Sequence, residues 1–174
     1  MLRLTLLTSY PMPVNNSSDA IMAHALKLLA LRNHSRQELE TKLRKKGYAL
    51  PIITEVLTAL STKGILNDQR FGEELLSSRA RRKPAGKMKI RAELLKKGVS
   101  EEITKELLND YNTQELCYQA AMKKLKSLSA SVDEQKRKHK LETFLRNRGF
   151  TWQDIHHALT LCFPAASISD YECE

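Results

Sequence analysis

Basic side chains are concentrated in one stretch of the sequence, residues 78–98, which reads SRARRKPAGKMKIRAELLKKG. The first carboxylate within it is Glu93, so most of its cations have no acidic neighbour along the chain. Closely spaced Lys and Arg side chains can hold phosphate oxygens or carboxylates by charge-assisted hydrogen bonds. A solvated surface is the alternative, but cations this close together repel one another when no anion is bound. The stretch therefore predicts an anionic partner.

Residues that could serve catalysis or metal binding are not arranged as either would require. His156, His157 and Cys162 lie close together, but adjacent histidines point to different faces of a helix, and no second pair of ligands follows. The phosphate-loop pattern GxxxxGK followed by Ser or Thr does not occur. No histidine has a partner that would mark a nucleophile and its base. We therefore predict that the chain is not an enzyme and holds neither a metal ion nor a cofactor.

Aromatic residues are not interleaved with the basic stretch, although proteins that bind single strands often stack bases on such side chains. This argues against base stacking as the main mode of binding. The aromatic residues elsewhere in the chain are expected to lie in the core or in contacts between helices. This expectation covers Tyr48, Phe71, Phe150 and Trp152.

The elements that position the basic residues follow a repeat marked by three glycines. Gly47, Gly98 and Gly149 are each separated from the next by 51 residues, and a Lys or Arg precedes each of them. Apolar residues stand four and eight positions before every one of these glycines, which places them on one face of a helix. Each glycine is suited to the left-handed conformation that ends a helix. The repeating unit is therefore a helix, a glycine stop and a second helix.

A further helix precedes the glycine-ending helix in each repeat, as the apolar periodicity and the capping residues indicate. The predicted caps are Ser35, Asn67 or Asp68, Ser100, Asn112 and Thr151. We predict an all-α fold of three tandem three-helix modules that form an elongated, curved helical repeat. The predicted modules are residues 20–66, 67–111 and 112–163, between a disordered tail at 1–19 and an acidic tail at 164–174.

The composition agrees with a helical, basic protein. The chain has 174 residues, of which 41% are hydrophobic and 6% aromatic, and its formal net charge is +9. A positive excess of this size favours an anionic partner such as nucleic acid. Its three cysteines, an odd number without framework spacing, indicate reduced thiols and a cytoplasmic location. No apolar run approaches the roughly 20 residues of a membrane-spanning helix, and a monomer is the simplest expectation.

Three motifs occur in a specific order, namely HSRQEL at residues 34–39, LNDQRF at 66–71 and ELLKKGVSEE at 93–102. In this order they resemble the RecX family of bacterial regulators of the RecA recombinase. The resemblance covers about residues 20–163. One departure is Pro84 and Ala85 before Gly86, where the family usually has a glycine sooner after the basic run. The resemblance implies tandem three-helix modules that bind in the groove of the RecA–DNA filament. It also implies inhibition of RecA's ATPase, strand-exchange and co-protease activities.

We predict that the contacts to RecA and to single- or double-stranded DNA are made by basic residues of the second and third repeats. The predicted contact residues are Arg79, Arg81, Arg82, Lys83, Lys87, Lys89, Arg91, Lys97, Arg146 and Arg148. The DNA contacts would be made through RecA and also directly. The alternative is a helical repeat protein that binds nucleic acid without any dependence on RecA.

Overall fold

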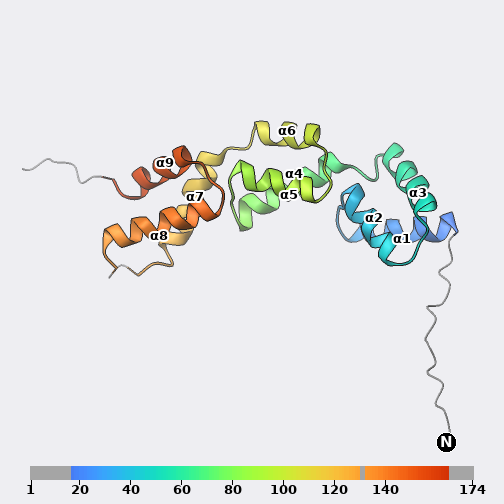
Figure 1. Cartoon of the computed structure of the whole chain (residues 1–174), viewed down its shortest axis with the longest axis horizontal. Coiled ribbons are helices and arrows are strands. Elements are labelled where there is room, and N and C mark those ends of the chain that lie inside the picture. The colour runs from blue at the N-terminus through green and yellow to red at the C-terminus, as the bar shows by residue number, and fades with distance from the viewer. Residues whose placement is uncertain (1–16, 130–131, 165–174) are drawn as a thin grey trace, which may run out of the picture. The chain divides into compact units, whose positions relative to one another are not determined.

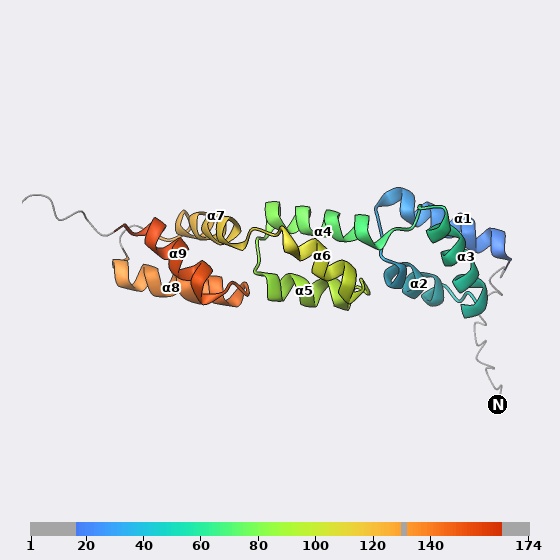
Figure 2. The same ribbon diagram turned by 90° about the horizontal axis from the view of Figure 1, so that it is seen from above.

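The computed structural model describes residues 17–129 and 132–164, and within these ranges it contains nine α-helices and no strand (Figure 1). The helices are α1 (Ser18–Leu31), α2 (Arg36–Lys45), α3 (Leu50–Thr62), α4 (Asp68–Arg82), α5 (Lys87–Lys96), α6 (Glu101–Asn109), α7 (Thr113–Leu125), α8 (Glu134–Asn147) and α9 (Trp152–Cys162). They form triplets α1–α3, α4–α6 and α7–α9 (Figure 2). The predicted all-α fold of three-helix modules is confirmed. The elongated curvature and the module boundaries stay predictions.

The chain divides into two compact units, a first unit up to Leu66 and a second unit from Asn67 onward. The first unit contains α1–α3, and the second contains the other two triplets. Helix α1 begins at Ser18, two residues before the predicted start at Ala20. The remainder of the two predicted tails lies outside the described residues, apart from Ser17 and Pro164.

The three repeated glycines end their helices in the predicted left-handed conformation, with φ of 95° at Gly47, 82° at Gly98 and 77° at Gly149. In the second triplet, the Gly98 amide donates to the Leu95 carbonyl at 2.9 Å, and the Val99 amide donates to the Leu94 carbonyl at 3.1 Å. The other two ends repeat both bonds. This pairing satisfies carbonyls that a helix end would otherwise leave without donors.

The helices that have a predicted N-cap residue begin directly after that residue. The side chains of Ser35, Asn67, Ser100, Asn112 and Thr151 each accept a hydrogen bond from a backbone amide of the first helical turn. Helix α5 differs, because its N-cap is Gly86 and no side chain caps it. Gly86 lies 51 residues after Ser35, so the repeat replaces a capping serine with glycine at this point.

Each triplet has its own apolar core, built from the positions that the repeat predicts. The residues four and eight positions before the three glycines are all fully buried. They are Leu43 and Leu39, Leu94 and Ile90, and Leu145 and Leu141. Phe71 and Phe150 are buried as expected, and Tyr48 packs against the first core. The prediction for Trp152 is wrong, because this side chain at the start of α9 is 63% exposed and stacks on His156 of the same helix.

The two triplets of the second unit meet through backbone contacts at Gly86. The Gly86 amide donates to the Arg148 carbonyl at 3.0 Å. Within the second triplet, the Tyr111 hydroxyl holds the same segment by donating to the Ala85 carbonyl at 2.9 Å. A Cβ atom on Gly86 would lie 1.7 Å from the Gly149 carbonyl oxygen. This close approach explains why glycine replaces a capping residue at the start of α5.

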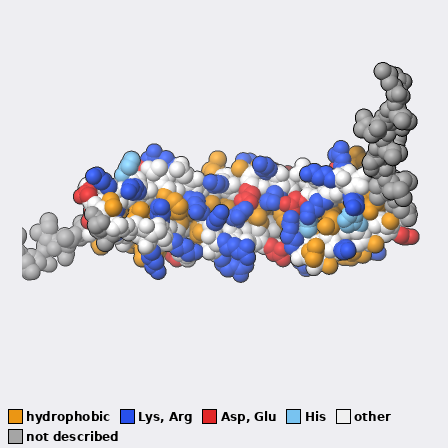
Figure 3. All heavy atoms as spheres, turned by 90° about the horizontal axis from the view of Figure 1, so that it is seen from below, with side chains coloured by type: hydrophobic (Ala, Val, Ile, Leu, Met, Phe, Trp, Pro, Cys, Tyr) orange, Lys and Arg blue, Asp and Glu red, His pale blue; other side chains and the backbone are white. Residues whose placement is uncertain are grey.

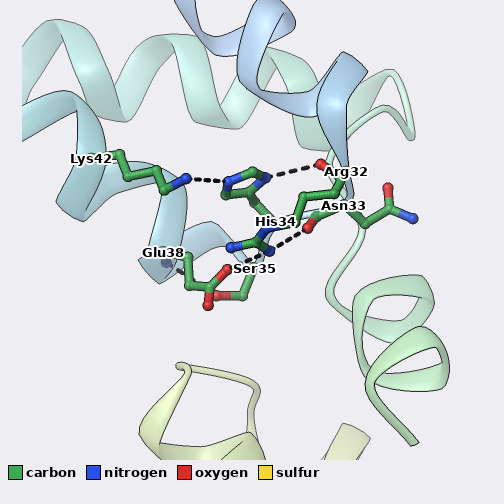
Figure 4. A network of polar contacts seen from close by, with 6 residues as sticks. All are labelled: Arg32, Asn33, His34, Ser35, Glu38 and Lys42. Atoms are coloured by element: carbon green, nitrogen blue, oxygen red, sulfur yellow. Dashed lines mark hydrogen bonds and ion pairs between the residues drawn. The ribbon is translucent and has the colours of Figure 1, made fainter. Parts of the chain in front are cut away.

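A buried histidine joins the end of α1 to α2 in the first unit (Figure 4). The His34 ring accepts a hydrogen bond at Nε2 from the Lys42 ammonium at 2.7 Å, and its Nδ1–H donates to the Arg32 carbonyl at 2.9 Å. An ammonium has only donors and a carbonyl only accepts, so this arrangement requires neutral His34 with its proton on Nδ1. Burial lowers the pKa of His34. The charges of Arg32 and Lys42 lower it further, against the Arg32 carbonyl bond and the Glu38 charge, which raise it.

We expect the chain to lose stability in acid through His34. Because its pKa is lower in the folded state, the unfolded chain binds the proton more readily, and stability falls as the pH drops below about 6.5. This contribution is fully present above that pH and is lost as the pH falls through the folded-state pKa. Urea unfolding followed by circular dichroism between pH 8 and pH 5 measures it. H34Q should flatten the pH dependence, whereas the exposed-site control H157Q should keep the wild-type slope.

Candidate functional site

The ten predicted contact residues all lie in the second unit, on α4, α5, α8 and the ends of these helices. We call them together the basic surface. In the space-filling view, Lys and Arg side chains gather over the part of the face that includes α4 and α5, with fewer acidic side chains among them (Figure 3). The residues of the basic surface differ in what they contact, and this decides how much net positive charge each one contributes.

Three arginines of the basic surface pair with carboxylates. Arg79 donates to Glu93 from Nε at 2.9 Å and also from its terminal nitrogen. Arg91 pairs with Glu101 at 2.5 Å, and Arg146 pairs with Glu142 one turn earlier on α8. The hydrogen bond from Arg79 also lowers the pKa of the Glu93 carboxyl, which therefore stays ionised. Since each pair is close to neutral, these arginines contribute little to a net positive field.

Two other cations donate to backbone carbonyls and keep their charge. The Lys89 ammonium donates to the Asn147 carbonyl at 2.9 Å, and Arg148 donates to the Pro84 carbonyl at 3.3 Å. A carbonyl holds a cation in place without neutralising it. The Lys97 ammonium lies 5.8 Å from the centre of the Phe71 ring, and its charge also lowers the pKa of the Glu93 carboxyl.

The four remaining residues of the basic surface are exposed and close together in sequence. Arg81 and Arg82 end α4, Lys83 follows them, and Lys87 begins α5. No carboxylate pairs with any of their side chains among the residues that the structure describes. This group is therefore the part of the basic surface that is most available to an anionic partner.

Two basic residues that the sequence analysis did not single out lie beside this group. Lys123 and Lys124 are in the last turn of α7, and they line a recess together with Arg82 and Arg148. The Lys123 ammonium donates to the Arg81 carbonyl at 2.9 Å. The only signal for them in the sequence is a short basic run at the end of a helix, which dipole stabilisation explains equally well. Their position beside α4 depends on the junction at Gly86.

Metal binding and reactive thiols find no support in the described part of the chain. No group of three His, Cys, Asp or Glu residues there could hold a metal ion. His156 and His157 are both exposed on α9, while Cys117 and Cys162 are free thiols. Burial raises the pKa of Cys117 to about 12, so this thiol stays protonated at neutral pH. None of the helices in residues 17–129 and 132–164 is long and apolar enough to cross a membrane.

Comparison with known protein families matches all three triplets. Residues 22–60 match the first three-helix domain of RecX, residues 67–108 the second and residues 110–159 the third. The regulatory protein RecX of Pelodictyon phaeoclathratiforme is 50% identical over 159 residues, which cover 91% of this chain and 99% of that protein. RecX of Chlorobium limicola is 46% identical over 160 residues, or 92% of this chain and 98% of that protein.

The fold is also similar to that of a solved structure. The crystal structure of RecX from Lactobacillus salivarius aligns with a TM-score of 0.71 and 22% identity, covering 83% of this chain and 95% of that one. At this identity the likeness concerns the fold alone. The curated relatives are named as regulatory proteins, which agrees with the prediction that this chain is not an enzyme. Through the match of all three domains and the identity to these relatives over most of its length, the chain belongs to the RecX family of regulatory proteins.

Proposed function

We propose that this protein binds in the helical groove of the RecA–DNA filament and inhibits RecA's ATPase, strand-exchange and co-protease activities. The observation that carries the proposal is the match of all three triplets, in order, to the domains of a regulatory family that resembles this chain in its motifs. The formal charge of +9 supports it, because a RecA–DNA filament presents DNA phosphates and protein carboxylates together.

The arrangement in triplets supports binding to a repeating partner. A filament offers the same surface at regular intervals, and each three-helix domain can meet one copy of it. Domains that are linked in one chain bind such a partner far more tightly than any one of them alone, since the later contacts form at high effective concentration. The Arg81–Lys87 segment of the basic surface is the proposed centre of contact, because its exposed cations have no carboxylate partner among the described residues.

The direct test is the ATPase rate of the cognate RecA on single-stranded DNA while this protein is added. We expect a saturable fall in rate that is complete at equimolar protein or below, because one bound chain restrains neighbouring RecA subunits. An unchanged rate, with tight binding of the protein to naked DNA in a parallel gel shift, would contradict the proposal. That result would favour a nucleic-acid-binding helical repeat that acts without RecA.

A further inference from the structure

The recess between α4, α7 and α8 is lined by cations from all three helices and by no carboxylate. Arg82 comes from the end of α4, Lys123 and Lys124 from the end of α7, and Arg148 from the end of α8. The recess has a volume of about 220 Å³. This is several times the roughly 30 Å³ that one water molecule occupies, so a phosphate group fits with water around it.

Three of the four cations of this recess are held in place by groups that leave their charge intact. Lys123 donates to the Arg81 carbonyl and Arg148 to the Pro84 carbonyl. Lys124 and Arg148 both lie against the Phe144 ring, at 5.6 Å and 4.9 Å from its centre. Each ammonium or guanidinium still has further donors to offer, since a lysine has three and an arginine five. Side chains that are already positioned lose less conformational entropy when an anion binds.

Two neighbouring recesses continue the row of cations. Arg148 also lines a recess of about 400 Å³ with Lys83 and Lys89, in which the one carboxylate, Glu93, is bonded to Arg79. Lys124 and Phe144 also line a recess of about 440 Å³ with Lys140, Thr143 and Asn147, which has no carboxylate. The three recesses therefore share wall residues and follow one another along the second unit.

A row of this kind suits a phosphodiester backbone better than an acidic protein segment. A nucleic-acid strand presents one negative charge per nucleotide at a regular interval, so it can meet successive recesses. The lining also combines Lys and Arg with the neutral donors Thr143 and Asn147. Hydroxyl and amide side chains beside cations are the usual contacts of phosphate oxygens in nucleic-acid complexes.

We infer that this recess is a phosphate-binding site for a nucleic-acid strand, with Lys123, Lys124, Arg82 and Arg148 as its cations. The inference rests on the proposed function, in that the strand would be the DNA of the filament, and it adds a direct contact to DNA that involves α7. The Phe144 ring is in contact with Lys124 and Arg148, and the site needs no base for the contact. We therefore expect it to bind phosphate irrespective of the base sequence.

The test is binding of a short, fluorescein-labelled single-stranded oligothymidylate to the full chain, measured by anisotropy over a range of NaCl concentrations. The variant is K123Q with K124Q, and the charge-matched control is K27Q with K105Q, two exposed lysines outside the three recesses. We expect the recess variant to lower the slope of log affinity against log salt by about 1.4, or about 0.7 for each lost phosphate contact. The control should keep the wild-type slope, and circular dichroism should show equal helix content for all three proteins.

Three results would overturn the inference. In the first, the recess variant binds the oligonucleotide with the affinity and salt slope of the wild type. In the second, it keeps DNA binding and loses binding to RecA free of DNA. The second result would assign the recess to an acidic protein segment. An oligonucleotide of the same sequence with an uncharged methylphosphonate backbone should bind the wild-type protein much more weakly. Equal binding of the two oligonucleotides would also contradict a phosphate site.

The RecA ATPase assay separates this inference from the proposed function. A wild-type protein that inhibits RecA but does not bind the oligonucleotide would overturn the phosphate site and leave the proposed function standing. A wild-type protein that binds the oligonucleotide in the recess but leaves the ATPase rate unchanged would overturn the proposed function and leave the phosphate site standing. A recess variant that loses DNA binding and inhibits RecA more weakly is the result that supports both.

Discussion

Replacing Gly86 with alanine should lower the free energy of unfolding of the second unit by about 3 kcal/mol or more. The added Cβ would lie 1.7 Å from the Gly149 carbonyl oxygen and 2.7 Å from the Phe150 nitrogen, which are backbone atoms and cannot rotate away. Gly86 has φ of −72°, a value that alanine adopts freely, so the entire expected effect is steric. Relief of the overlap requires the two triplets to separate. This would break the bond from the Gly86 amide to the Arg148 carbonyl.

Urea unfolding followed by circular dichroism measures the loss. M88A is the matched control, because Met88 is 70% exposed two residues further along α5 and should leave stability nearly unchanged. A G86A variant as stable as the wild type would show that the triplets do not meet at these glycines. In that case the recess between α4, α7 and α8 would also lose its support.

Charge reversal at three exposed positions should weaken binding to the RecA–DNA filament by about tenfold to a hundredfold. The variant is R81E, R82E and K87E together. If each lost contact contributes about 0.5 to 1 kcal/mol, as is typical of exposed ion pairs, the sum corresponds to that range. Binding of the protein to filaments assembled on single-stranded DNA, measured by cosedimentation, gives the affinity. Helix content should stay intact, because all three side chains are exposed.

The control for this variant carries the same change of net charge at other exposed sites, namely K27E, R70E and K105E. It distinguishes the effect of the position of the cations from the effect of net charge, because both variants reduce the overall positive field equally. Equal losses in the two variants would mean that the basic surface has no special part in binding. Wild-type inhibition of RecA by the R81E, R82E and K87E variant would remove this segment from the contact surface.

Local features of the fold could be predicted from the sequence because they depend on neighbours along the chain. A glycine at the end of an apolar stripe fixes a helix end, and Ser35 or Thr151 fixes a start, through bonds that span a few residues. The interval of 51 residues then indicates how many times the unit occurs. The basic surface also follows from local sequence, since eight of its ten residues lie within residues 78–98.

Features that depend on tertiary contacts could not be predicted in the same way. Lys123 and Arg82 are far apart in sequence and share a recess only because the two triplets meet at Gly86. The pairing of Arg79 with Glu93 likewise depends on how α4 packs beside α5. The repeat places Trp152 next to the buried Phe150, but no helix of the described chain covers its side chain. The apolar periodicity predicts which residues share a face of a helix, but it does not predict what packs against that face.

The contact between Gly86 and Gly149 means that the second and third domains are not interchangeable building blocks. Glycine at the start of α5 is required only because a third domain follows and places a carbonyl against it. A chimaera that joins the second domain of one homologue to the third of another must therefore match both glycines, whatever the similarity of the cores. Likewise, deleting the third domain would leave α5 without a side-chain cap and would remove the acceptor of the Gly86 amide, the Arg148 carbonyl.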